Sequence, residues 1–96
     1  MIIVKQLCKM IREELADAEK YAKEYRLAAE KDQKLAETYK RLANEELDHS
    51  NMLHAEAVRK IKEANTPAPE SMQAVWNWEH ELMIEQTAKI KQMLTL

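Results

Sequence analysis

Glycine is absent from all 96 residues of this chain, and both of its prolines lie in one short segment, EANTPAPESM at residues 63–72. Glycine and proline are the residues that most often interrupt helices and form turns. The remaining sequence is rich in Ala, Glu, Lys, Leu, Gln and Met, which are good helix formers. Long uninterrupted helices are therefore expected on both sides of the proline segment, and the sequence predicts an all-α protein.

Two breaks divide the chain into three predicted helices. A loop is expected at residues 65–69, after which Pro69 and Glu70 suit the first turn of a new helix. The earlier break is softer, and Asp32 can cap the helix that follows it. The expected helices cover residues 2–30, 33–64 and 70–94 of a single domain, 1–96. Because short connections favour antiparallel neighbours, the first two helices should form a hairpin to which the third is added.

Charge and hydropathy exclude several classes of partner. The 15 basic and 17 acidic residues are dispersed and leave a net charge of −2, which favours neither nucleic acid nor an anionic membrane as a partner. The apolar runs are far shorter than the roughly 20 residues of a transmembrane helix, and MIIVKQLCKM lacks the apolar core of a signal peptide. We expect a soluble, cytoplasmic protein. Cys8 is the single cysteine and is expected to be a small core residue.

Apolar residues recur along each predicted helix at alternating spacings of three and four, the pattern of a helix that faces a partner helix. The stripe of the first helix contains Leu7, Ile11, Glu14, Ala18, Tyr21, Tyr25 and Ala28. The second contains Leu35, Tyr39, Leu42, Glu46, His49, Leu53 and Ala57. The third contains Met72, Trp76, Glu79, Met83, Gln86, Ile90 and Met93. His54 and His80 lie beside these stripes and are expected at the surface.

Glutamates interrupt the stripes, and a buried carboxylate needs a partner or a metal ion. Glu14 lies about as far before the first predicted turn as Glu46 lies after it, so a rise of about 1.5 Å per residue places them at nearly the same height. His49 follows Glu46 by three residues and shares its helix face. Carboxylates with an imidazole suit iron, manganese or zinc. The sequence therefore predicts Glu14, Glu46 and His49 as metal ligands.

These residues resemble the ferritin-like superfamily, in particular the helical hairpins of rubrerythrin-type and encapsulated-ferritin-type proteins. In those hairpins one helix carries Glu-x-x-x-x-x-x-Tyr, matched here by Glu14 and Tyr21, and the next carries Glu-x-x-His, matched by Glu46 and His49. The resemblance covers about residues 7–57. It implies a di-iron site with Tyr21 close to the ligands, and iron oxidation or storage as the function. If the protein is an enzyme, the resemblance implies a ferroxidase-like or peroxidase-like oxidoreductase.

The chain departs from this family in carrying a single Glu-x-x-His, whereas a complete four-helix site uses two. A homodimer or higher even oligomer could complete the site about a two-fold axis, as the resemblance to encapsulated ferritins implies. Alternatively, Glu79 or His80 of the third helix could complete it within one chain. An antiparallel third helix places Glu79 level with about residue 55, which is ~9 Å from His49 along the helix axis. We therefore expect a half-bundle completed by dimerisation.

A second hypothesis needs no metal. Polar residues in the stripes of helical bundles also form ion pairs and fix the register of the helices, so the chain could be a metal-free structural or interaction module. The short chain and the sequence VWNWEHE in the third helix also resemble small phage proteins.

Overall fold

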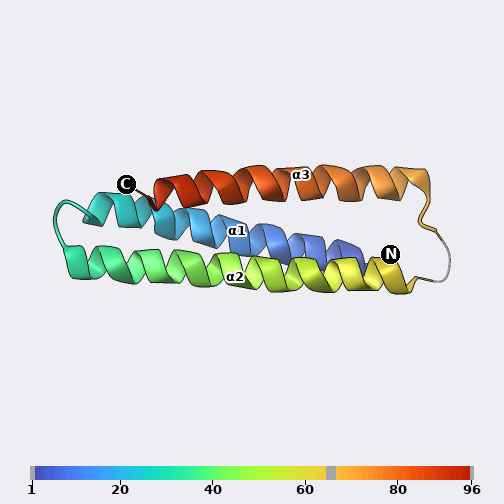
Figure 1. Ribbon diagram of the computed structural model, residues 1–96, viewed down its shortest axis with the longest axis horizontal. Coiled ribbons are helices and arrows are strands. Elements are labelled where there is room, and N and C mark those ends of the chain that lie inside the picture. The colour runs from blue at the N-terminus through green and yellow to red at the C-terminus, as the bar shows by residue number, and fades with distance from the viewer. Residues whose placement is uncertain (1, 65–66, 96) are drawn as a thin grey trace.

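The structure, a computed structural model, describes residues 2–64 and 67–95, and these residues form three α-helices joined by short connections (Figure 1). The helices are α1 (Ile2–Ala28), α2 (Gln33–Glu63) and α3 (Glu70–Met93). The prediction of an all-α chain with three helices is confirmed. Each helix ends one or two residues before the expected position. Asn65 and Thr66 of the expected loop lie outside the described residues.

Local sequence accounts for where the second and third helices begin. Asp32 has an extended backbone and its carboxylate accepts a hydrogen bond of 3.1 Å from the Leu35 amide, which satisfies one of the free amides at the start of α2. Pro69 occupies the corresponding position before α3, and its carbonyl accepts from the amides of Met72 and Gln73. Glu70 then places a negative charge at the positive end of the helix dipole.

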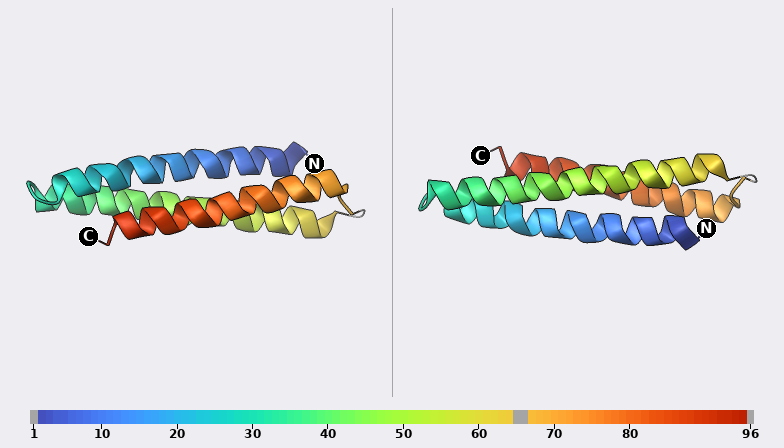
Figure 2. Two further views of the ribbon diagram at one scale, coloured as in Figure 1. Left: turned by 90° about the horizontal axis from the view of Figure 1, so that it is seen from above. Right: turned by 90° about the horizontal axis from the view of Figure 1, so that it is seen from below.

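The three helices lie side by side in a rod of about 54 × 17 × 16 Å. α2 runs antiparallel to α1, and α3 returns antiparallel to α2, so that it runs in the same direction as α1 (Figures 1 and 2). α3 packs mainly against α1 and touches α2 less extensively. None of the helical segments that the structure describes combines the length and apolarity that a bilayer span requires.

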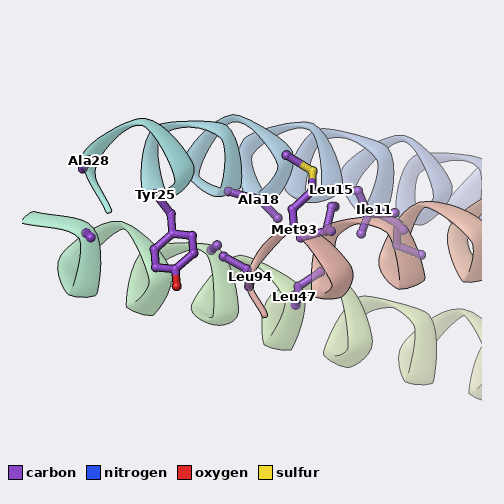
Figure 3. Packing of buried hydrophobic residues seen from close by; sticks show 12 residues of the cluster. Ile11, Leu15, Ala18, Tyr25, Ala28, Leu47, Met93 and Leu94 are labelled. Atoms are coloured by element: carbon purple, nitrogen blue, oxygen red, sulfur yellow. The ribbon is translucent and has the colours of Figure 1, made fainter. Parts of the chain in front are cut away.

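Small residues fill the interface between α1 and α2. Ala18, Ala22, Ala36, Ala43 and Ala57 are completely buried, and side chains this small let two helix backbones approach closely. Larger side chains fill the space that α3 adds. Leu15, Leu47 and Ile90 belong to one buried cluster, and Met93 and Leu94 lie within it, with Tyr25 and Ala28 farther toward the hairpin turn (Figure 3). The one buried polar residue in the described core is Ser50, whose hydroxyl donates to the Leu47 carbonyl at 2.8 Å.

Over residues 35–50, the predicted stripe of α2 is displaced by one residue from the buried stripe, whereas Ala57 farther along is buried as predicted. Ala36, Ala43, Leu47 and Ser50 are buried, whereas their predicted neighbours Leu35, Leu42, Glu46 and His49 are half-buried or exposed. In α1 likewise, Leu15 and Ala22 take the buried positions expected for Glu14 and Tyr21. The reason is that α3 covers one flank of the hairpin, so burial is greatest toward that side. The stripe predicted for α3 is correct, since its members are buried or half-buried.

Candidate metal centre

Three predicted ligands come together on the flank of the α1–α2 hairpin. Glu14 of α1 and Glu46 and His49 of α2 each offer a ligand atom, and these atoms all lie within 4.8 Å of one another. His49 Nδ1 is 3.5 Å from a Glu14 carboxylate oxygen and 3.8 Å from a Glu46 oxygen. Two donor atoms on one ion at about 2.1 Å are themselves about 3.0–4.2 Å apart. The two distances from His49 fall within this range, whereas the 4.8 Å limit on all three ligand atoms is slightly wider than it.

The fold positions these side chains through helix geometry alone. The hairpin turn at residues 29–32 sets α1 against α2 so that Glu14 and Glu46 stand at the same level, and one turn of α2 separates Glu46 from His49. The side chains are progressively more exposed, at 19% for Glu46, 27% for Glu14 and 52% for His49. Two carboxylates and an imidazole form a hard, anionic donor set that fits iron, manganese or zinc, and the exposed side leaves room for further ligands.

Tyr21 lies on the same flank as Glu14 but two helical turns away from it. Its ring stacks on Tyr39 of α2 with the ring centroids 6.4 Å apart, and it packs against the edge of the core. This position makes Tyr21 a neighbour of the Glu14 group along α1 rather than one of its contacts.

Glu79 and His80 lie on a different side of the hairpin. The carboxylate of Glu79 forms an ion pair with the Arg12 guanidinium. Arg12 precedes Glu14 by two residues and therefore points about 200° away from it around α1. The structure thus separates both residues of α3 from the Glu14 group, and the alternative of a site completed within one chain by α3 does not hold in this arrangement.

The flank that α3 covers carries paired charges. Besides Arg12 and Glu79, Lys89 donates to the Glu19 carboxylate at 2.8 Å, and this hydrogen bond is the main reason that the pKa of Glu19 is lowered. Cys8 is buried here, as expected, and burial, followed by the charge of Glu79, raises the pKa of its thiol. A thiol with a raised pKa stays protonated at neutral pH and is a poor nucleophile.

The expectation that His54 and His80 lie at the surface is wrong. Both are half-buried and form a cluster of three rings with Trp76 between α2 and α3. Their positions beside the predicted stripes suggested exposure, but α3 meets α2 along a side of α2 that the predicted α2 stripe omits, and Trp76 of the α3 stripe contacts both rings there. The sequence did contain a signal, since antiparallel counting from the proline loop places residue 79 level with about residue 55.

Comparison with models of known families, with curated proteins and with solved structures found no match to this chain.

Proposed function

We propose that this protein binds iron through Glu14, Glu46 and His49, and that two copies share a ferritin-like di-iron site. The observation that carries the proposal is the convergence of these three side chains, from two helices, with ligand atoms within 4.8 Å of one another. Exposed acidic residues are common on helices, but here an imidazole lies between two carboxylates at a spacing suited to one ion. Manganese and zinc are the other metals that this donor set accepts.

The shape of the hairpin supports completion of the site by a second copy. α3 covers the opposite flank, so the flank with Glu14 remains open. Ile3 and Met10 follow helical spacing with Glu14 on α1 and are 42% and 45% exposed, and Leu35 on the matching face of α2 is 42% exposed. A two-fold axis through this flank would bury these apolar side chains and bring together four carboxylates and two imidazoles.

The ligand types of Glu14, Glu46 and His49 suit such a site to iron in both of its common oxidation states. Two carboxylates per copy neutralise the charge of ferrous iron and stabilise the ferric state still more, because hard anionic oxygen ligands favour the higher charge. The open side of His49 would admit ferrous iron and an oxidant such as dioxygen or peroxide, which would accept the electrons that the iron loses. This chemistry corresponds to iron oxidation or storage, with ferrous iron as the substrate.

The test is to load the untagged protein with ferrous iron without oxygen, and to measure bound metal by elemental analysis and mass by light scattering. We expect stoichiometric iron and a dimer or higher even oligomer. Glu46→Ala should abolish stoichiometric binding, whereas Glu45→Ala, one position away and exposed beside Arg41, should retain it. Equal loss in the two variants would indicate a diffuse acidic surface, and a monodisperse monomer with bound metal would overturn the shared site.

A metal-free interaction module is the second candidate, and one observation favours it. A protonated His49 would form ion pairs with both Glu14 and Glu46 at the observed 3.5 and 3.8 Å, so the three residues can balance their charges without an ion. In that case they would fix the register of α1 against α2, or of this chain against a helical partner.

A further inference from the structure

Two histidines outside the Glu14 group face each other across the junction of α2 and α3. The ring centroids of His54 and His80 are 4.8 Å apart and the rings are tilted by 45°. Trp76 contacts both rings, with centroid distances of 5.6 Å to His54 and 5.9 Å to His80. The pair is therefore held by one residue of α2 and one turn of α3.

One nitrogen in this cluster lacks a partner. His54 Nε2 is buried, and no group among residues 2–64 and 67–95 forms a hydrogen bond with it. A buried polar atom without a partner costs about 1–3 kcal/mol, so such an atom calls for a ligand. Burial, and then the charge of His80, lower the pKa of His54. The imidazole is consequently neutral at pH 7, the form that binds a metal ion.

The distance between the rings fits coordination of one ion by both. At metal–nitrogen bonds of about 2.0–2.1 Å and bond angles near 90–110°, the centroids of two imidazoles lie about 4.5–5.2 Å apart. The observed 4.8 Å falls within this range, and the tilt shows that the rings are not stacked face to face. A cavity of about 900 Å³ is lined by Trp76, on the edge of the cluster, but by neither histidine.

We propose that His54 and His80 form a second metal site, a two-histidine clamp that ties α3 to α2 by binding Zn²⁺, Cu²⁺ or Ni²⁺. These borderline ions prefer imidazole nitrogen, whereas Mn²⁺ and Mg²⁺ prefer oxygen ligands. The chain would then hold two sites of different chemistry on different sides of one hairpin, an oxygen-rich site at Glu14 and a nitrogen site at His54. This proposal does not depend on the proposed function, because the two sites share no residue.

Trp76 provides the readout for this site. In an untagged Trp78→Phe variant it is the single tryptophan, and Ni²⁺ bound beside it should quench its fluorescence. We expect saturable quenching that Zn²⁺ reverses by competition and that Mn²⁺ does not produce. Replacing His80 by Ala in this background should weaken Ni²⁺ binding about tenfold or more, since even indirect partners of a ligand contribute that much.

Two further variants make the result decisive. His54→Phe keeps a ring against Trp76 and preserves packing, so it should lose quenching while retaining the helical circular dichroism of the parent. His49→Ala removes a ligand of the Glu14 group and should leave quenching unchanged. Equal quenching in the parent and in His54→Phe, or loss of quenching in His49→Ala, would overturn the proposal.

Discussion

The two flanks of the α1–α2 hairpin differ in how their polar groups are satisfied. On the covered flank, the ion pairs of Arg12 with Glu79 and of Glu19 with Lys89 join α1 to α3. On the open flank, Glu14 and Glu46 face each other across the hairpin with His49 as their common neighbour. The first flank pairs Glu79 and Glu19 with permanent cations, while the second gathers two carboxylates around one imidazole.

The covered flank therefore holds the helices together, whereas the open flank carries the groups that can bind an ion. Paired charges at a helix interface help to select the partner helix and its direction, and they need nothing from solution. Two carboxylates that share one histidine depend on the cations available in solution to balance their charge. The open flank is therefore where a change in solution conditions should affect the protein most directly, and three predictions test that assignment.

The largest effect is expected in the core beneath α3. Leu15 is 1% exposed, so Leu15→Ala should lower the free energy of unfolding by about 2–5 kcal/mol, the range for cavity-forming substitutions. Leu35→Ala, on the open flank, is the matched control and should cost less in a single chain. Denaturant melts at low and high protein concentration would measure both.

The dependence of these two costs on protein concentration tests whether a second copy covers the open flank. If a second copy covers the open flank, the cost of Leu35→Ala should grow with protein concentration, because the lost contact then belongs to the dimer. The difference between the flanks would be contradicted if the cost of Leu35→Ala stayed constant across a hundredfold range of protein concentration. It would also be contradicted if Leu35→Ala cost as much as Leu15→Ala in a monomer.

An intermediate effect is expected from metal binding at the open flank. An ion that binds only the folded state stabilises it by about 2.7 kcal/mol when free metal is a hundredfold above its dissociation constant. After chelation, the clustered carboxylates repel each other, so replacing both Glu14 and Glu46 by Gln should stabilise the metal-free protein and remove its response to metal. Thermal melts at pH 7 with and without Zn²⁺, as a redox-inert ion, would show this.

The metal-free alternative predicts the reverse for the same variant. If His49 forms ion pairs with Glu14 and Glu46, the two Gln substitutions should destabilise the protein whether or not metal is present. A wild-type protein without a metal response, together with a destabilised double variant, would favour the interaction module over the iron site. Glu19→Gln is a useful control, since it should weaken only the exposed contact with Lys89 and change stability slightly.

The smallest effect is expected from pH at the covered flank. Burial lowers the pKa of His54 in the folded protein, so between the folded pKa and the unfolded value of about 6.5 the unfolded chain binds more protons. The stability that a neutral His54 preserves is complete above about pH 6.5 and is lost as the pH falls toward the folded pKa. Melts across this window should show a shallower acid loss for His54→Phe than for wild type. Parallel curves would mean that His54 does not contribute.

The helical architecture and the meeting of Glu14 with Glu46 were predictable because both follow from fixed helix geometry. Once the turn near residue 31 is located, the rise per residue sets which positions of α1 and α2 stand level. The exact buried face was not predictable in the same way. Ala36 and Ala43 adjoin Leu35 and Leu42, and periodicity favours the larger pair, but α3 decides which side is covered. The ring cluster of His54, His80 and Trp76 was missed for the same reason, since it exists only where α3 meets α2.

The alanines between α1 and α2 set the distance between these two helices, and so the distance between the metal ligands that they carry. With Ala18 and Ala43 completely buried, the thickness of single methyl groups sets how far the backbone of Glu14 stands from that of Glu46. Under the proposed function, residues that never touch the ion would therefore fix the distance between the ligand atoms, and with it the preference of the site among ions of different radius. A substitution that adds or removes a methyl group at the α1–α2 interface could thus change the metal preference while every ligand stays the same.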